Sequence, residues 1–163
     1  MAKTDDVLLA LSRTIPEFIR SVGSFQYRGK TYRLVNNFAS SQYMKCSLCG
    51  NYPIFDVSVI RSQDGDRLNA CNNCIDQITN LVVSGWFKTY RKKRENIIEN
   101  REYIDGLSLV LAAYEQNELS FKISSEDVEK LRKTFVQMCN GLNPRTEQKH
   151  LASVPFRVAV NSV

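Results

Sequence analysis

Residues 46–50 read CSLCG and residues 71–74 read CNNC, so two Cys-x-x-Cys pairs are separated by 21 residues. A Cys-x-x-Cys turn is tight enough to offer two sulfur atoms to one metal ion, and two such turns complete a tetrahedral ligand set. The intervening residues can form a hairpin that returns the chain to the first pair. The predicted ligands of one structural Zn²⁺ ion are Cys46, Cys49, Cys71 and Cys74.

Three other uses of these thiols fit the sequence less well. Disulfides seldom persist inside cells, and a thioredoxin-like redox site needs one Cys-x-x-Cys pair in a βαβ setting, which the sequence does not suggest. A rubredoxin-like iron site also uses four thiolates, but glycine usually follows both pairs, whereas here Gly50 follows the first and Ile75 the second. Zinc is therefore favoured over iron. Cys139 stands alone beside Met138 and is interpreted as a small core residue.

The order of elements around the cysteines resembles that of treble-clef zinc fingers. A knuckle at 46–50 is followed by an expected hairpin at 54–70 and by a second knuckle, at 71–74, that opens a helix. This broad group includes GATA-type fingers and nuclear-receptor modules, although the two pairs lie farther apart here than in GATA fingers. The resemblance covers residues 43–94 and implies one zinc ion with a helix displayed beside it.

Hydrophobic periodicity predicts strands in the first half of the chain. The alternation IFDVSVIR at 54–61, the turn residues Asp64-Gly65 and the segment 67–70 predict one hairpin. Residues 24–35 predict another hairpin around Arg28-Gly29-Lys30, and residues 36–42 are expected to form a loop. The first helix is expected over about residues 5–21, with a kink at Pro16 or a second helix capped by Thr14.

The second half of the sequence is predicted to be helical. One helix is expected from about residue 72 to 94 or beyond, and the helical pattern continues to about 117 with a break near 96–100. A further helix starts at Ser124 or Ser125, with Asp127 placed for a capping box. Its inner face carries Val128, Leu131, Phe135 and Met138, and it ends at Gly141 and Pro144.

These elements predict an α+β fold: a treble-clef-like zinc module with a hairpin, flanked by an N-terminal helix and by C-terminal helices. We expect an N-terminal helix and hairpin (1–42), a zinc module with a basic helix (43–94), a helical region (95–144) and a tail (145–163), together forming one compact unit. Residues 153–160 of the tail, SVPFRVAV, are expected to form a strand or an extended arm.

The positive charge of the chain is concentrated locally. The formal charge is +5 over 163 residues, and four thiolates binding one Zn²⁺ would lower it to +3. Such a cluster suits phosphate contacts, although runs of charge on long helices are often only solvated surface, and Glu95 and Glu99 follow closely. The basic cluster consists of Lys88, Arg91, Lys92, Lys93 and Arg94.

A second basic candidate lies in the first hairpin, where Arg28, Lys30 and Arg33 alternate with aromatic residues. These residues either contact nucleic acid or accompany tyrosines that cover the edge of the core. Trp86 and Tyr90, four residues apart, are interpreted as core anchors, with base stacking as the alternative.

An enzymatic role is not expected. Four cysteines fill a zinc shell and leave no open position for an activated water molecule. The only histidine is His150, far from the cysteines in sequence, and Asp64 and Asp66 are explained by the turn. The sequence shows no phosphate loop and no serine nucleophile elbow.

The sequence therefore favours a zinc-binding, nucleic-acid-associated protein that regulates transcription or replication. Expected partners are DNA or RNA, the transcription machinery, and a second copy through the C-terminal helices. The alternative is a zinc-stabilised protein-interaction adaptor. The N-terminus does not resemble a secretory signal, and no apolar run approaches the ~18–20 residues of a membrane span. We expect no membrane partner and an intracellular location: cytoplasmic, or nuclear in a eukaryote.

Overall fold

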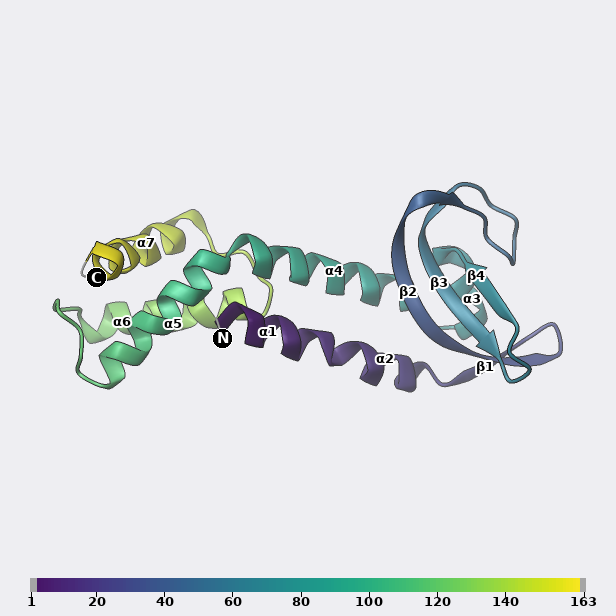
Figure 1. The fold of residues 1–163 in the computed structure, drawn as a ribbon, viewed down its shortest axis with the longest axis horizontal. Helices are drawn as coiled ribbons and strands as arrows, with labels where there is room; N and C mark the ends of the chain where they lie inside the picture. Colours follow the sequence, from purple (N-terminus) through teal and green to yellow (C-terminus); the bar gives the residue numbers. More distant parts are fainter. Residues whose placement is uncertain (1–2, 162–163) are drawn as a thin grey trace. The chain divides into compact units, whose positions relative to one another are not determined.

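The computed structural model describes the backbone of residues 3–161 and the side chains of residues 3–153. The chain divides into two compact units, one formed by Arg13–Tyr90 and the other by the residues up to Ser12 together with those from Arg91 onward. The first unit contains a four-stranded antiparallel sheet and the second is helical (Figure 1). The predicted α+β class is confirmed.

The sheet has the order β1-β2-β3-β4, with β1 at Ser24–Tyr27, β2 at Lys30–Met44, β3 at Ile54–Ser62 and β4 at Arg67–Ala70. The first predicted hairpin is confirmed, because Tyr27 pairs with Lys30 across a two-residue turn. Arg28 and Gly29 have φ values of 47° and 76° in this turn, as the tight primed turns of hairpins require. The hairpin between β3 and β4 is also confirmed.

The predicted loop at 36–42 is wrong, because β2 continues through it and curves together with β3 (Figure 1). Asn36–Ala39 pair with Val59–Asp56 through the backbone. The ladder uses N–H and C=O groups that every residue except proline has. Polar side chains are therefore compatible with the strand where they meet water, as the exposed Asn36 does, or where they find a partner, as Asn37 does by donating to the Ser58 hydroxyl at 2.9 Å.

Helices cover one face of the sheet and build the core of the first unit. Leu34 and Ile60, which pair across β2 and β3, pack with Ile75 of α3 (Asn72–Thr79) and Val83 of α4 (Val83–Glu99). The ring of Trp86 stacks on Phe18 of α2 (Thr14–Val22), with 4.1 Å between ring centroids. Trp86 is thus a core anchor, and its ring also stacks on Tyr90 at 5.7 Å.

Two helix boundaries differ from the prediction. The single helix expected from residue 72 is two helices, since Asn80 adopts the left-handed conformation (φ 54°) and ends α3. The carboxylate of Asp76 then accepts the backbone N–H of Ser84 at 2.9 Å and caps α4. A second helix does form around Pro16, after α1 (Lys3–Ser12), but its N-cap position is Arg13 and not Thr14.

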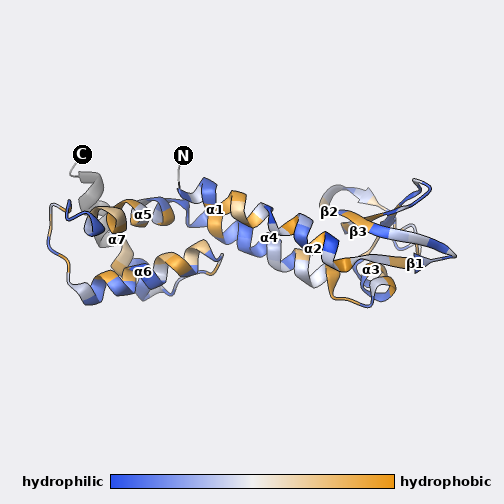
Figure 2. Ribbon diagram, turned by 90° about the horizontal axis from the view of Figure 1, so that it is seen from below, coloured by the Kyte–Doolittle hydropathy of each residue, from blue (hydrophilic) through white to orange (hydrophobic). Residues whose placement is uncertain are grey.

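The second unit contains α1, the later turns of α4, α5 (Arg101–Glu115), α6 (Ser125–Cys139) and α7 (Thr146–Asn161). The break predicted near 96–100 falls between α4 and α5. The hydroxyl of Ser124 caps α6 by accepting the N–H of Asp127 at 3.1 Å, as predicted. Hydrophobic and hydrophilic residues alternate along α6 (Figure 2), and its fully buried residues include Leu131 and Met138.

The prediction of a strand or extended arm at 153–160 is wrong, because these residues belong to α7. The first turns of α7 place Ala152 in the hydrophobic core of the second unit, where it is fully buried. Packing of these turns explains why the helix prevails over the strand preference of the valines that follow. Among residues 3–161, no helix combines the length and the hydropathy that a membrane span requires.

Candidate metal centre

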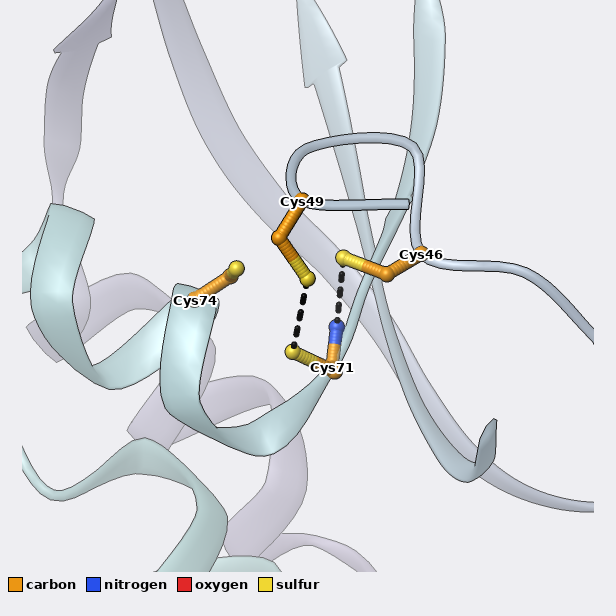
Figure 3. A group of neighbouring side chains, drawn as sticks. All are labelled: Cys46, Cys49, Cys71 and Cys74. Carbon is orange, nitrogen blue, oxygen red and sulfur yellow. Dashed lines mark hydrogen bonds between the residues drawn. The ribbon is translucent and has the colours of Figure 1, made fainter. Parts of the chain in front are cut away.

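The four predicted cysteine ligands come together in the first unit. Cys46 and Cys49 lie in the loop between β2 and β3, Cys71 occupies the N-cap position of α3, and Cys74 lies in its first turn. The four side chains point toward one another (Figure 3). Their Sγ atoms all lie within 4.8 Å of one another.

These distances suit one tetrahedral metal ion. Zn–S bonds of about 2.3 Å place the sulfur atoms of a tetrahedral site about 3.8 Å apart. The Sγ atoms of Cys49 and Cys71 are 3.9 Å apart, and all five cysteines of the chain are free thiols. The arrangement is consistent with a four-cysteine zinc site, while Cys139 belongs to the other unit and packs against its core.

Hydrogen bonds fix the first knuckle relative to the end of β4, which leads into the second cysteine pair. The N–H of Gly50 donates to the carbonyl of Cys46 at 3.0 Å and closes the first knuckle. Ser47 and Asn69 exchange two bonds: the N–H of Ser47 donates to the Asn69 carbonyl at 2.7 Å, and the Asn69 N–H donates to the Ser47 hydroxyl at 3.0 Å. The first knuckle is therefore fastened to β4 two residues before Cys71.

The surroundings of the thiols shift their pKa values in different directions, down for Cys46 and up for Cys71 and Cys74. Burial raises the pKa of Cys46, but backbone N–H groups of Cys49, Cys71 and Leu48 outweigh it and lower the value to about 6. One of these donors, the N–H of Cys71, lies 3.3 Å from the Cys46 sulfur (Figure 3). Burial raises the pKa of Cys71 and of Cys74. Because metal ligands must be thiolates, metal binding would displace protons from the latter two.

The centre is also part of a small hydrophobic core. Cys46 and Cys71 are 1% and 8% exposed and cluster with Val57 and Val59 of β3. The side chain of Lys45 lies against the knuckle, since a Cβ atom added to Gly50 would be 3.7 Å from its Cε. Lys45 thus places a positive charge beside a centre whose four thiolates and one Zn²⁺ would sum to −2.

The predicted basic cluster lies on α4, which follows α3, the helix that carries Cys74. Lys92 forms an ion pair with Glu95 at 3.8 Å, and the backbone of Lys93 packs against Gly141. Lys88 and Arg94 are exposed, whereas Arg91 is half-buried. The charges of this cluster are therefore mixed with acidic groups of the same helix.

Two of the three basic residues predicted from the first hairpin have partners within the structure. Lys30 forms ion pairs with Asp66 and, at 3.5 Å, with Asp64, and both carboxylates raise its pKa. The guanidinium of Arg28 lies over the ring of Tyr27, 5.3 Å from its centroid. Arg33 differs, because within the described residues it makes no ion pair.

Arg33 belongs to a row of three arginines that the sequence analysis missed. Arg33 of β2 pairs with Arg61 of β3, which pairs with Arg67 of β4. Directly paired residues share one face of a sheet. All three are exposed, and none forms an ion pair or side-chain hydrogen bond within the part of the chain whose side chains are described. We call Arg33, Arg61 and Arg67 the arginine row.

The arginine row lies on the face of the sheet that carries Val57 and Val59, two members of the cluster around Cys46. Successive odd-numbered residues of β3 point to the same side, so Val57 and Val59, which pack against Cys46, lie on the face of Arg61. The neighbouring residues Leu34 and Ile60 point to the opposite side, into the core under the helices. Arg61 and Arg67 also line a hollow together with Val35, Asn36 and Gly65. Only the strand register, which a short sequence window does not specify, could have revealed this row.

Comparison of the chain with models of known protein families, with curated proteins and with solved structures gave no match.

Proposed function

We propose that this protein is a zinc-binding, nucleic-acid-associated protein that contacts phosphates through the arginine row. The observation that carries the proposal is the alignment of three exposed arginines across three strands, on the face that also carries Val57 and Val59. Arginine binds phosphate in a bidentate manner and releases counterions when it does so. A pattern of like charges that no described acidic side chain neutralises suits an anionic polymer.

The cysteine centre supplies the rigid support of this surface. A knuckle, the hairpin β3–β4 and a helix that carries the second cysteine pair follow one another as they would in a treble-clef finger. We propose that one Zn²⁺ ion, held by the four cysteines, fastens the knuckle to β4 beside Arg67. The role is structural, and we propose no catalytic step.

The biological setting that we propose is regulation of transcription or replication, with the transcription machinery and a second copy of the chain as further partners. The basic cluster of α4 is a secondary candidate contact, because Glu95 already pairs with Lys92. The arginine row is the stronger candidate, since the carboxylates of the nearby turn, Asp64 and Asp66, are engaged by Lys30.

The test is fluorescence anisotropy with labelled DNA and RNA over a range of salt concentrations. The wild type should bind with an affinity that falls steeply as salt rises. The triple variant Arg33→Gln, Arg61→Gln, Arg67→Gln should bind more weakly, with a salt slope reduced by about 3, or about 1 per lost phosphate contact. A matched control is Arg20→Gln, which removes one exposed arginine of α2 in the same unit.

A second triple variant, Arg91→Glu, Lys92→Glu, Arg94→Glu, measures the contribution of α4. Its helicity has to match that of the wild type by circular dichroism. If the arginine-row variant binds like the wild type, contact through the arginine row is wrong, and weaker binding of the α4 variant would then assign the contact to α4. If the wild type binds no nucleic acid at low salt, the whole proposal is wrong and the protein-interaction adaptor replaces it.

A further inference from the structure

Three exposed aromatic side chains flank the first knuckle in the sequence and lie close to one another. Tyr43 precedes it, Tyr52 follows it and Phe55 is the second residue of β3; they are 71%, 59% and 50% exposed. The ring centroid of Tyr43 lies 6.0 Å from that of Tyr52 and 6.0 Å from that of Phe55. We call these three residues the aromatic trio.

The aromatic trio does not pack in a hydrophobic core. The other aromatic pairs of this unit, such as Phe18 with Trp86 and Tyr27 with Tyr32, pack on or within its core. The trio belongs to none of the core clusters formed by the described residues. Aromatic rings that adjoin one another while half or more of each remains exposed are typical of a surface that meets a ligand.

A hollow of mixed polar and apolar lining, which also includes Ile54 and Cys71, adjoins the trio at Phe55. Its lining includes Asn51, Asp56, Asn72 and Asn73 as well as Phe55 itself. The side-chain amide of Asn72 donates to the Asp56 carboxylate at 3.1 Å, on the side of β3 opposite to the Phe55 ring. Asn51 and Asn73, which line the same hollow as Phe55, are exposed, and their side-chain amides can hydrogen-bond the edge of a base that stacks there.

The charge of the same unit complements a nucleic acid strand. Lys45 lies between Tyr43 and Cys46 in sequence, and the arginine row crosses β3 at Arg61, six residues after Phe55. At about 3.3 Å per residue, this is about 20 Å along the strand. Stacking rings at one end of β3 and guanidinium groups at the other would hold the bases and the phosphates of one strand.

We propose that the ligand is single-stranded nucleic acid, with unpaired bases stacked on Tyr43, Tyr52 and Phe55. This inference rests on the proposed function and adds the form of the ligand. The bases of a duplex are stacked on one another and do not offer their faces to protein rings, whereas the bases of a single strand do. Single-stranded DNA and RNA share this chemistry.

The experiment compares three probes by anisotropy: single-stranded DNA and single-stranded RNA of about 12 nucleotides, within the range of single-strand sites, and the corresponding DNA duplex. The wild type should bind at least one single strand about tenfold or more tightly than the duplex. The variant Tyr43→Leu, Tyr52→Leu, Phe55→Leu should lose at least about tenfold affinity for that strand, because each stacked base accounts for roughly 5- to 150-fold. The control Phe121→Leu, in the other unit, should bind like the wild type.

Leucine keeps the surface apolar while removing the π-face, so the variant separates stacking from a merely hydrophobic contact. Unchanged metal content and Trp86 fluorescence establish that the variant is folded. If it does not fold, Tyr43→Leu alone and photocrosslinking of the wild type to a halogenated single strand provide the readout, with crosslinks expected at the trio.

The outcomes separate the two proposals. Binding of duplex as tight as that of either single strand, or full single-strand affinity in a folded leucine variant, overturns the single-strand inference and leaves the proposed function standing. Crosslinks that avoid the trio also overturn the inference. Failure of the wild type to bind any of the three probes at low salt overturns both proposals and points to a protein that docks on the rings.

Discussion

Arg61 of β3 lies directly opposite Arg33 of β2, and both side chains are exposed. Along its other edge, β3 pairs with β4, and Arg67 of β4 lies directly opposite Arg61 on the same face of the sheet. Like charges at directly opposite positions destabilise a sheet. The unit therefore gives up some stability at these positions, as proteins commonly do where a surface is shaped by binding.

We expect Arg61→Gln to stabilise the first unit at low ionic strength, by up to about 1 kcal/mol, because it removes the central charge of the row. The gain should shrink in about 1 M salt, where the Debye length is about 3 Å. Denaturant unfolding followed by the fluorescence of Trp86, the only tryptophan, provides the measurement. Arg20→Gln, on α2, is the control. A loss of stability at low salt would contradict charge repulsion in the row.

Metal removal should unfold the unit Arg13–Tyr90 and spare the other. Metal binding supplies about 10–16 kcal/mol in small zinc modules, which matches or exceeds the whole stability of an ordinary domain. Without it, the buried cluster of Cys46, Cys71 and two valines loses the ion that joins its parts.

The two units can be followed separately during chelation. Trp86 stacks on Phe18 in the first unit, so its emission should shift to the red. Much of the far-ultraviolet circular dichroism should remain, because α5, α6 and α7 belong to the other unit and contribute to its own core. Unchanged Trp86 emission after complete removal of the metal would contradict a structural role for the site.

The cysteines should differ sharply in their effect on metal content. Cys71→Ser should abolish stable binding of one zinc ion per chain, because it removes one of four converging ligands and alters the residue at the start of α3. Cys139→Ser should leave the metal content unchanged, since Cys139 packs with the core of the helical unit. Native mass spectrometry with elemental analysis measures both. One zinc ion retained in Cys71→Ser, or lost in Cys139→Ser, would refute the assignment of ligands.

Gly141→Ala should be strongly destabilising. Gly141 ends α6 with φ +74°, where an L side chain costs about 1–2 kcal/mol. An added Cβ would also lie 2.7 Å from the backbone Cα of Lys93, and such overpacking typically costs a further ~1–3 kcal/mol. The carbonyl of Gly141, which accepts the side-chain amide of the buried Asn96 at 2.8 Å, would be displaced as well.

Gly29→Ala is the matched comparison, because Gly29 has a similar φ of +76° but no atom within 4 Å of an added Cβ. This substitution should lower the free energy of unfolding only by the cost of placing an L side chain at positive φ. Urea unfolding followed by circular dichroism measures both variants. Equal losses of stability would show that the contact with Lys93 relaxes without cost.

Much of the local structure follows from short-range patterns. The turn Arg28-Gly29, the capping of α6 by Ser124 and the alternation at 54–61 each depend on neighbouring residues, and each is confirmed. The errors arose where distant contacts prevail. Strand pairing extends β2 through polar residues, and packing of Ala152 keeps a valine-rich segment in α7.

The sequence by itself determined the cluster of four cysteines, because the spacing within each Cys-x-x-Cys pair constrains two sulfur atoms to converge, and the hairpin between the pairs is encoded locally. Only the tertiary structure decided which basic residues act together. Arg33, Arg61 and Arg67 are separated by 27 and 5 intervening residues, and they become neighbours through the register of β2, β3 and β4. A register is set by the whole buried face of a sheet, since a shift of one residue would turn every side chain to the other side.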